Sequence, residues 1–140
     1  MTPRPDERGS VSLWLITASF AAIFLVGLAV DLGGQVHAQQ RAHDLAAQAA
    51  RAGGQEIEAA PAIAGTRLTV DVSAARSAAE GFLRAAGTTG AVTVSGGDIL
   101  TVRVTDTYQT RFLGVIGINR LQVTGEASAR LVRALAGAEL

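Results

Sequence analysis

The feature that most constrains this chain is an uninterrupted apolar segment near its N-terminus. Residues 11–30, VSLWLITASFAAIFLVGLAV, contain no charged side chain. A helix of this length rises about 30 Å, which matches the hydrocarbon thickness of a bilayer. Trp14 lies one turn inside the N-terminal boundary, where interfacial indoles are common, and Asp31 follows the other boundary. The segment therefore predicts a transmembrane helix, with Trp14 and Asp31 at the two membrane interfaces.

Two fates of this segment stay open, because it can remain as an anchor or be removed as a signal peptide. A small-x-small pattern ends at Ala38 and would allow cleavage there. The apolar stretch is about twice as long as the core of a usual signal peptide, and Asp31 interrupts it before that pattern, so we expect an anchor. Arg4 and Arg8 precede the segment, and the positive-inside rule therefore places residues 1–10 in the cytoplasm.

Small residues recur at helical spacing in and after the apolar segment. Ala18 and Ala22 are four residues apart, a spacing that lets a second helix approach closely in lipid. Residues 31–54 continue as a juxtamembrane amphipathic helix, with a flexible joint expected at Gly33-Gly34 and a stop at Gly53-Gly54. The apolar face of this helix is narrow and consists of Ala38, Ala42, Leu45, Ala46 and Ala49. Such a face suits packing against a sheet or another helix, not a ligand pocket.

A linker and a second helix follow. Residues 55–66 contain Pro, Gly and mixed polarity, which predicts a linker, and a short extended piece is expected at 67–70. The next segment has apolar residues at helical spacing, with Asp71 as the expected N-cap and Gly87 as the expected C-terminal stop.

The remainder of the chain changes to a period of two. Two alternating runs flank the turn signal at 95–98 and predict a hairpin. A connector over 108–118 is expected to carry a helical turn, and a long alternating strand follows from Leu121 to Leu131. The predicted class is α+β: a long N-terminal helix, then a small pilin-like head over 67–140 with one helix and a three-stranded antiparallel sheet.

The composition gives no support to catalysis. The chain has no cysteine, its formal net charge is zero, and all 12 of its Lys and Arg residues are arginine. Cysteine-based metal or nucleophile chemistry is therefore excluded, and no overall charge favours nucleic acid. His37 and His43 would point in different directions on a helix, and no carboxylate cluster completes a metal site. We therefore predict no catalytic residue, no metal, no cofactor, no small-molecule substrate and no nucleic-acid partner.

Four segments of the chain carry a family resemblance: ERGSVSLWLI at 7–16, GLAVDLGG at 27–34, QQRAHDLAAQAARAGGQ at 39–55 and RFLGVIGINRLQVTGEASARLV at 111–132. The chain resembles type IV pilins and pseudopilins, and is more closely similar to the TadE/TadG-like group of tight-adherence (Flp) pilus-assembly proteins. This resemblance implies a non-enzymatic, single-pass protein of the bacterial inner membrane with an extracytoplasmic C-terminal domain. Its implied partners are other pilin-like subunits, a membrane assembly platform and membrane lipid.

The resemblance also implies a processing site, with one departure from the pilin pattern. Prepilin peptidases cut after a glycine that follows charged residues, which here would be between Gly9 and Ser10. Pilins usually carry glutamate at the fifth mature position, and this chain has Trp14 there. Cleavage after Gly9, cleavage after Ala38 and no cleavage all stay open. The alternative function is an exported or membrane-tethered binding module whose apolar segment serves only as signal anchor or signal peptide.

Overall fold

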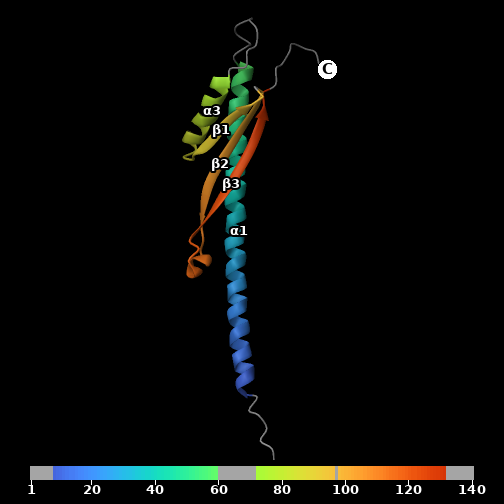
Figure 1. Ribbon diagram of the computed structural model, residues 1–140, viewed down its shortest axis with the longest axis vertical. Helices are drawn as coiled ribbons and strands as arrows, with labels where there is room; N and C mark the ends of the chain where they lie inside the picture. The colour runs from blue at the N-terminus through green and yellow to red at the C-terminus, as the bar shows by residue number, and fades with distance from the viewer. Residues whose placement is uncertain (1–7, 60–71, 97, 132–140) are drawn as a thin grey trace, which may run out of the picture.

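The computed structural model describes residues 8–59, 72–96 and 98–131 of the chain. It confirms the predicted α+β class, with two helices and one three-stranded antiparallel sheet in this part of the chain (Figure 1). The elements are α1 (Arg8–Ala59), α3 (Val72–Ala85), β1 (Gly90–Ser95), β2 (Ile99–Gln109), the 3-10 turn η1 (Leu113–Ile116) and β3 (Arg120–Arg130). The extended piece expected at 67–70 and the N-cap expected at Asp71 lie outside the described residues.

Helix α1 is continuous over 52 residues, and its N-terminal half projects well beyond the rest of the protein (Figure 1). The helix passes through Gly33-Gly34 without a break, and the flexible joint expected there stays a prediction. Gly34 instead lies directly under the side chain of Tyr108, and a Cβ there would collide with the phenol. This glycine permits close approach of two elements and does not interrupt the helix.

The helix end expected at Gly53-Gly54 is wrong, because α1 continues to Ala59. The reason is again packing: a Cβ at Gly53 would lie 2.7 Å from the carbonyl oxygen of Ala75 and would collide with the Leu100 side chain. A glycine inside a helix costs conformational entropy, and at this position it gives α3 and the sheet room to reach α1. The division of the chain into the ranges 1–10, 11–30, 31–54, 55–66 and 67–140 stays a prediction.

Helix α3 ends as predicted at a glycine. Gly87 has a φ of 67°, and its N–H donates to the carbonyl of Arg84 while the N–H of Thr88 donates to that of Leu83. These two bonds form a Schellman motif, which satisfies the last carbonyls of the helix. On the predicted apolar face of α3, the buried residues are Ala75, Ala79 and Leu83.

The sheet has the order β1-β2-β3 and follows the predicted alternation. Val92 pairs with Val102, and Val104 pairs with Gly125. Inward-facing residues of β3 are small at the centre, where Gly125 lies directly against the backbone of Ala42 and His43 in α1. The absence of a Cβ at 125 lets the long helix lie close against the sheet.

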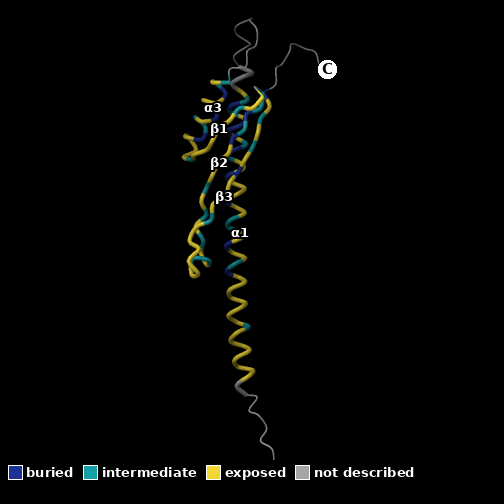
Figure 2. Tube along the Cα trace, viewed as in Figure 1, coloured by how far each residue is buried: buried dark blue, intermediate teal, exposed yellow. Residues whose placement is uncertain are grey.

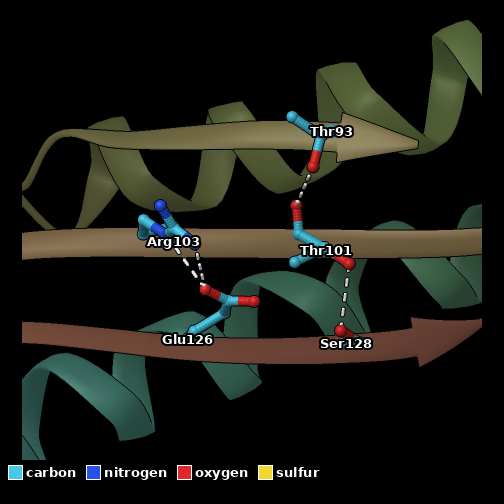
Figure 3. A network of polar contacts seen from close by, with 5 residues as sticks. All are labelled: Thr93, Thr101, Arg103, Glu126 and Ser128. Carbon is cyan, nitrogen blue, oxygen red and sulfur yellow. Dashed lines mark hydrogen bonds and ion pairs between the residues drawn. The ribbon is translucent and has the colours of Figure 1, made fainter. Parts of the chain in front are cut away.

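Both helices cover the same face of the sheet (Figure 3). The buried cluster on that face is made mostly of Ala, Val and Leu, as expected for a chain with only 4% aromatic residues. The opposite face carries polar contacts: Thr101 shares a hydrogen bond of 3.0 Å with Ser128, and the Arg103 guanidinium donates to the Glu126 carboxylate at 2.6 Å (Figure 3). The polar face is thus suited to solvent, and α1 is part of the core of the head.

Candidate functional site

One face of α1 makes the contacts with the head, and we call it the docking face. It consists of Gly27, Asp31, Gly34, Ala38, Ala42, Ala46, Ala49 and Gly53. Successive members are three or four residues apart, so they form a single stripe along the helix. All of them are buried except Gly34, which is half-buried. The head therefore lies along the helix from Gly27, inside the apolar segment, to Gly53.

The polar member of this face, Asp31, holds the loop that joins β2 to β3. Its Oδ1 accepts the backbone N–H of Arg111 at 2.7 Å and the Tyr108 hydroxyl at 3.3 Å. Its Oδ2 accepts the backbone N–H groups of Phe112 at 2.9 Å and Leu113 at 2.6 Å. We call this arrangement the Asp31 clasp. Three consecutive main-chain donors converge on one carboxylate, so the negative charge is compensated without a cationic side chain.

The electrostatics of the clasp favour the ionised carboxylate, even though the side chain has no exposed surface. Desolvation acts to raise the pKa of Asp31. The hydrogen bonds from the backbone of Arg111, Leu113 and Phe112, together with that from Tyr108, outweigh this effect and leave the pKa below its ordinary value. The clasp therefore holds a charged group just beyond the C-terminal end of the apolar segment.

Two glycines on either side of Asp31 let the loop approach α1. A Cβ at Gly27 would lie 2.8 Å from the Phe112 ring, and a Cβ at Gly34 would collide with Tyr108. The Phe112 ring is thus seated on the helix inside the apolar segment, one turn before Asp31. Asp31 and the two glycines together determine where the β2–β3 loop lies along the axis of α1.

The projecting half of α1 is apolar and uncovered (Figure 2). Large apolar side chains there are exposed, and the exposed fraction is 70% for Trp14 and 76% for Phe20. By length and composition α1 can cross a membrane once, and little of its most apolar part is buried in the protein. The structure is compatible with a single transmembrane helix.

The residues predicted to matter fall into three groups. Gly9 and Ser10 lie in the first turn of α1. Ala18 and Ala22 lie on the projecting half, where Ala22 is exposed and Ala18 partly exposed. The structure brings Ala42, Ala46 and Ala49 together in the core, with Leu45 packed at its edge. Packing residues chosen from the sequence are thus divided between a buried face and an open one.

Sequence reasoning missed the contacts of Asp31. It placed this residue at the end of the membrane segment and did not connect it to Tyr108 or to the backbone at 111–113, 77 to 82 residues away. One signal was available, because Gly27, Asp31 and Gly34 share the helical spacing of the alanines that follow. Small residues on both sides of a lone acid indicate a helix face that another element touches.

The described residues offer no cluster of side chains suited to a metal ion. No group of three or more His, Cys, Asp or Glu side chains could hold a metal ion in the ranges 8–59, 72–96 and 98–131. His37 and His43 are both exposed on α1. The Asp31 carboxylate is occupied by donors of the protein itself, so this buried acid acts as a structural group.

The part of the chain that matches a known protein family includes the whole docking face. Residues 9–56 match the family model described as Tad, putative Flp pilus-assembly TadE/G-like. No curated protein and no solved structure matches the chain. The matched range contains the apolar segment, the Asp31 carboxylate and the alanines that pack on the sheet, and it supports a role in pilus assembly. The predicted resemblance is confirmed: over residues 9–56 this chain is similar to the TadE/G-like Flp pilus-assembly family.

Proposed function

We propose that the protein is a non-enzymatic, membrane-anchored component of a Tad/Flp-type pilus or a related secretion apparatus. In this proposal α1 crosses the inner membrane once, with residues 1–10 in the cytoplasm and the α+β head outside it. The protein acts as a pseudopilin-like assembly subunit, and its partners are other pilin-like subunits and a membrane assembly platform. The family match over residues 9–56 supports the pilus-assembly part of this proposal.

The observation that carries the proposal is the division of α1 into two halves. Ala42, Ala46 and Ala49 are buried in the core of the head, whereas the large apolar side chains at 11–26 are exposed. A soluble protein rarely exposes a continuous apolar surface of this length, and about 20 residues of helix match the bilayer. Because α1 is one continuous helix, a displacement of the membrane half would reach the head through that helix.

Contact with other subunits is proposed at the open small-residue face of α1. Ala18 and Ala22 permit close approach of a second helix in lipid. Ala22→Leu adds bulk on this face without touching the head, and Ala21→Leu adds the same bulk about 100° away around the helix. We expect Ala22→Leu to reduce pilus assembly and recovery of partner subunits after mild crosslinking, while Ala21→Leu has little effect. Equal behaviour of the two variants would argue against this helix face.

The decisive experiment is the intact mass and N-terminal residue of the protein recovered from the cell envelope. A start at Met1 with resistance to alkaline extraction supports an uncleaved anchor. A start at Ser10 that disappears in Gly9→Val supports processing as a pseudopilin. A start at Gln39 with the protein free in the medium favours the exported binding module and contradicts the membrane-anchored subunit.

A further inference from the structure

The β2–β3 loop carries a second exposed apolar surface, separate from the projecting half of α1. Phe112, Val115, Ile116 and Ile118 are all exposed, and Val115 reaches 87%, the highest value among the exposed large hydrophobic side chains of the described residues. We call these four residues the loop tip. Isolated apolar side chains are common on protein surfaces, but four within seven residues form a patch that calls for a partner.

The position of the loop tip along α1 is fixed by contacts already described. Phe112 packs on Gly27, and Asp31 binds the main chain at 111–113. Gly27 lies three residues before Val30, which is about 4.5 Å along the helix axis inside the apolar segment. Figure 1 shows this loop at the end of the head that points toward the projecting half of α1, and Figure 2 shows exposed residues on both. The loop tip and the end of the apolar segment therefore lie at the same level.

The backbone of the loop suits an apolar environment. Irregular backbone in lipid is tolerated only where its polar groups find partners within the protein. The N–H groups at 111–113 bond to Asp31, those of Val115, Gly117 and Ile118 bond to carbonyls within the loop, and that of Thr110 bonds to the carbonyl of Asn119. These internal bonds lower the free-energy cost of moving the loop out of water.

The charges around the loop tip indicate what covers it. Arg111 and Arg120 are exposed at the two ends of the loop, as arginines that reach lipid phosphates would be. The acids nearby are already engaged, since Asp31 is enclosed and Asp106 pairs with Arg41 at 3.3 Å. An apolar tip between two arginines complements the boundary between acyl chains and phosphate headgroups.

We propose that the β2–β3 loop enters the outer face of the bilayer beside α1, with the loop tip among the lipid acyl chains and Arg111 and Arg120 at the phosphates. The inference rests on the proposed anchoring of residues 11–30. In this arrangement the Asp31 clasp joins the inserted loop to the membrane helix. The head then lies against the bilayer in one orientation. A membrane helix with a second point of insertion cannot swing freely.

The cysteine-free chain allows a direct test with single nitroxide labels. Full-length protein carrying Val115→Cys, Ile23→Cys or Ser77→Cys is reconstituted in vesicles of phosphatidylethanolamine and phosphatidylglycerol. The relative collision rates of each label with oxygen and with a water-soluble nickel complex report its depth. Ile23 is exposed on the apolar helix, and Ser77 is exposed on α3, so they serve as the lipid and water references. We expect the oxygen-to-nickel ratio at 115 to be well above that at 77 and somewhat below that at 23, because Ile23 lies about 6 Å deeper along the helix than Gly27.

Each other outcome is distinct. A lipid-like label at 23 with a water-like label at 115 overturns loop insertion and leaves the anchor standing. A water-like label at 23 overturns the anchor and the inference together. A label at 115 that is shielded from both reagents, and becomes mobile when the lipid-to-protein ratio is raised tenfold, shows that a second copy of the chain covers the loop tip and contradicts lipid contact.

Discussion

The carboxylate of Asp31 accepts a hydrogen bond of 2.6 Å from the backbone N–H of Leu113, which lies 82 residues further along the chain. Asp31 has no exposed surface, so water cannot replace this bond unless the loop moves away. The contact therefore joins the end of the apolar segment to the β2–β3 loop. The core of the head holds the C-terminal half of α1. The hydrogen bond between Asp31 and Leu113 holds the β2–β3 loop beside the end of the apolar segment.

Replacing Asp31 with asparagine should release the loop while keeping the volume of the side chain. The amide supplies only one acceptor oxygen, and its NH2 group faces main-chain donors that then lack a partner. We expect hydrogen exchange at the 111–113 amides to become roughly tenfold faster in the full chain in detergent, measured by mass spectrometry. Asp44→Asn, an exposed position on the same helix, is the control and should leave that exchange unchanged. Full protection in Asp31→Asn would contradict the clasp.

Acid should weaken the Asp31 clasp, because protonation removes the charge of the Asp31 carboxylate that accepts its hydrogen bonds. Hydrogen bonds to the carboxylate hold the pKa of Asp31 below its ordinary value of 3.8. A group with a lowered pKa in the folded state stabilises the fold above its unfolded pKa, and this stabilisation is lost as the pH falls through the folded pKa. We expect the amide chemical shifts at 111–113 to titrate with a midpoint below 3.8, and to lose this transition in Asp31→Asn. A midpoint above 3.8 would contradict the pKa direction.

The sequence predicted those parts of the fold that depend on local patterns. Alternation from Leu121 to Leu131 predicted β3, and the turn signal at 95–98 predicted the β1–β2 hairpin, in which the structure pairs Val92 with Val102. Gly87 was placed correctly at the end of α3. Each of these features is encoded within a few neighbouring residues, so periodicity and turn chemistry are sufficient to find it.

Contacts between distant segments were not predictable in the same way. The partners of Asp31 are mainly backbone N–H groups, which any sequence supplies and which leave no signature. The helix end expected at Gly53 was wrong and the contact at Gly34 was missed, because glycine has two uses, flexibility and close approach, and the sequence alone does not separate them. Deciding between these uses required knowing that Tyr108 and Leu100 lie over those two positions.

The adjacent glycines of α1 give a matched pair that separates helix propensity from packing. A Cβ at Gly33 meets nothing within 4 Å, so Gly33→Ala should raise stability by about 0.5–1 kcal/mol. Gly34→Ala gains the same propensity but displaces Tyr108, the only tyrosine in the chain. We expect the ring resonances of Tyr108 to shift in Gly34→Ala alone, and that variant to lose part or all of the gain. Unchanged Tyr108 resonances in Gly34→Ala would show that this glycine is not a contact.

The closest approach of the head to α1 should be the least tolerant of added volume. A Cβ at Gly125 would collide with the backbone of Ala42 and His43, and main chain cannot rotate away as the Tyr108 side chain can. We therefore expect Gly125→Ala to destabilise the head by about 1–3 kcal/mol, despite the gain in strand propensity. Gly81→Ala, on α3 with nothing within 4 Å, is the control and should stabilise by about 0.5–1 kcal/mol. Thermal unfolding of the full chain in detergent, followed by circular dichroism, measures both. A Gly125→Ala protein as stable as Gly81→Ala would show that α1 and β3 can separate without cost, and the helix could then not transmit its position to the head.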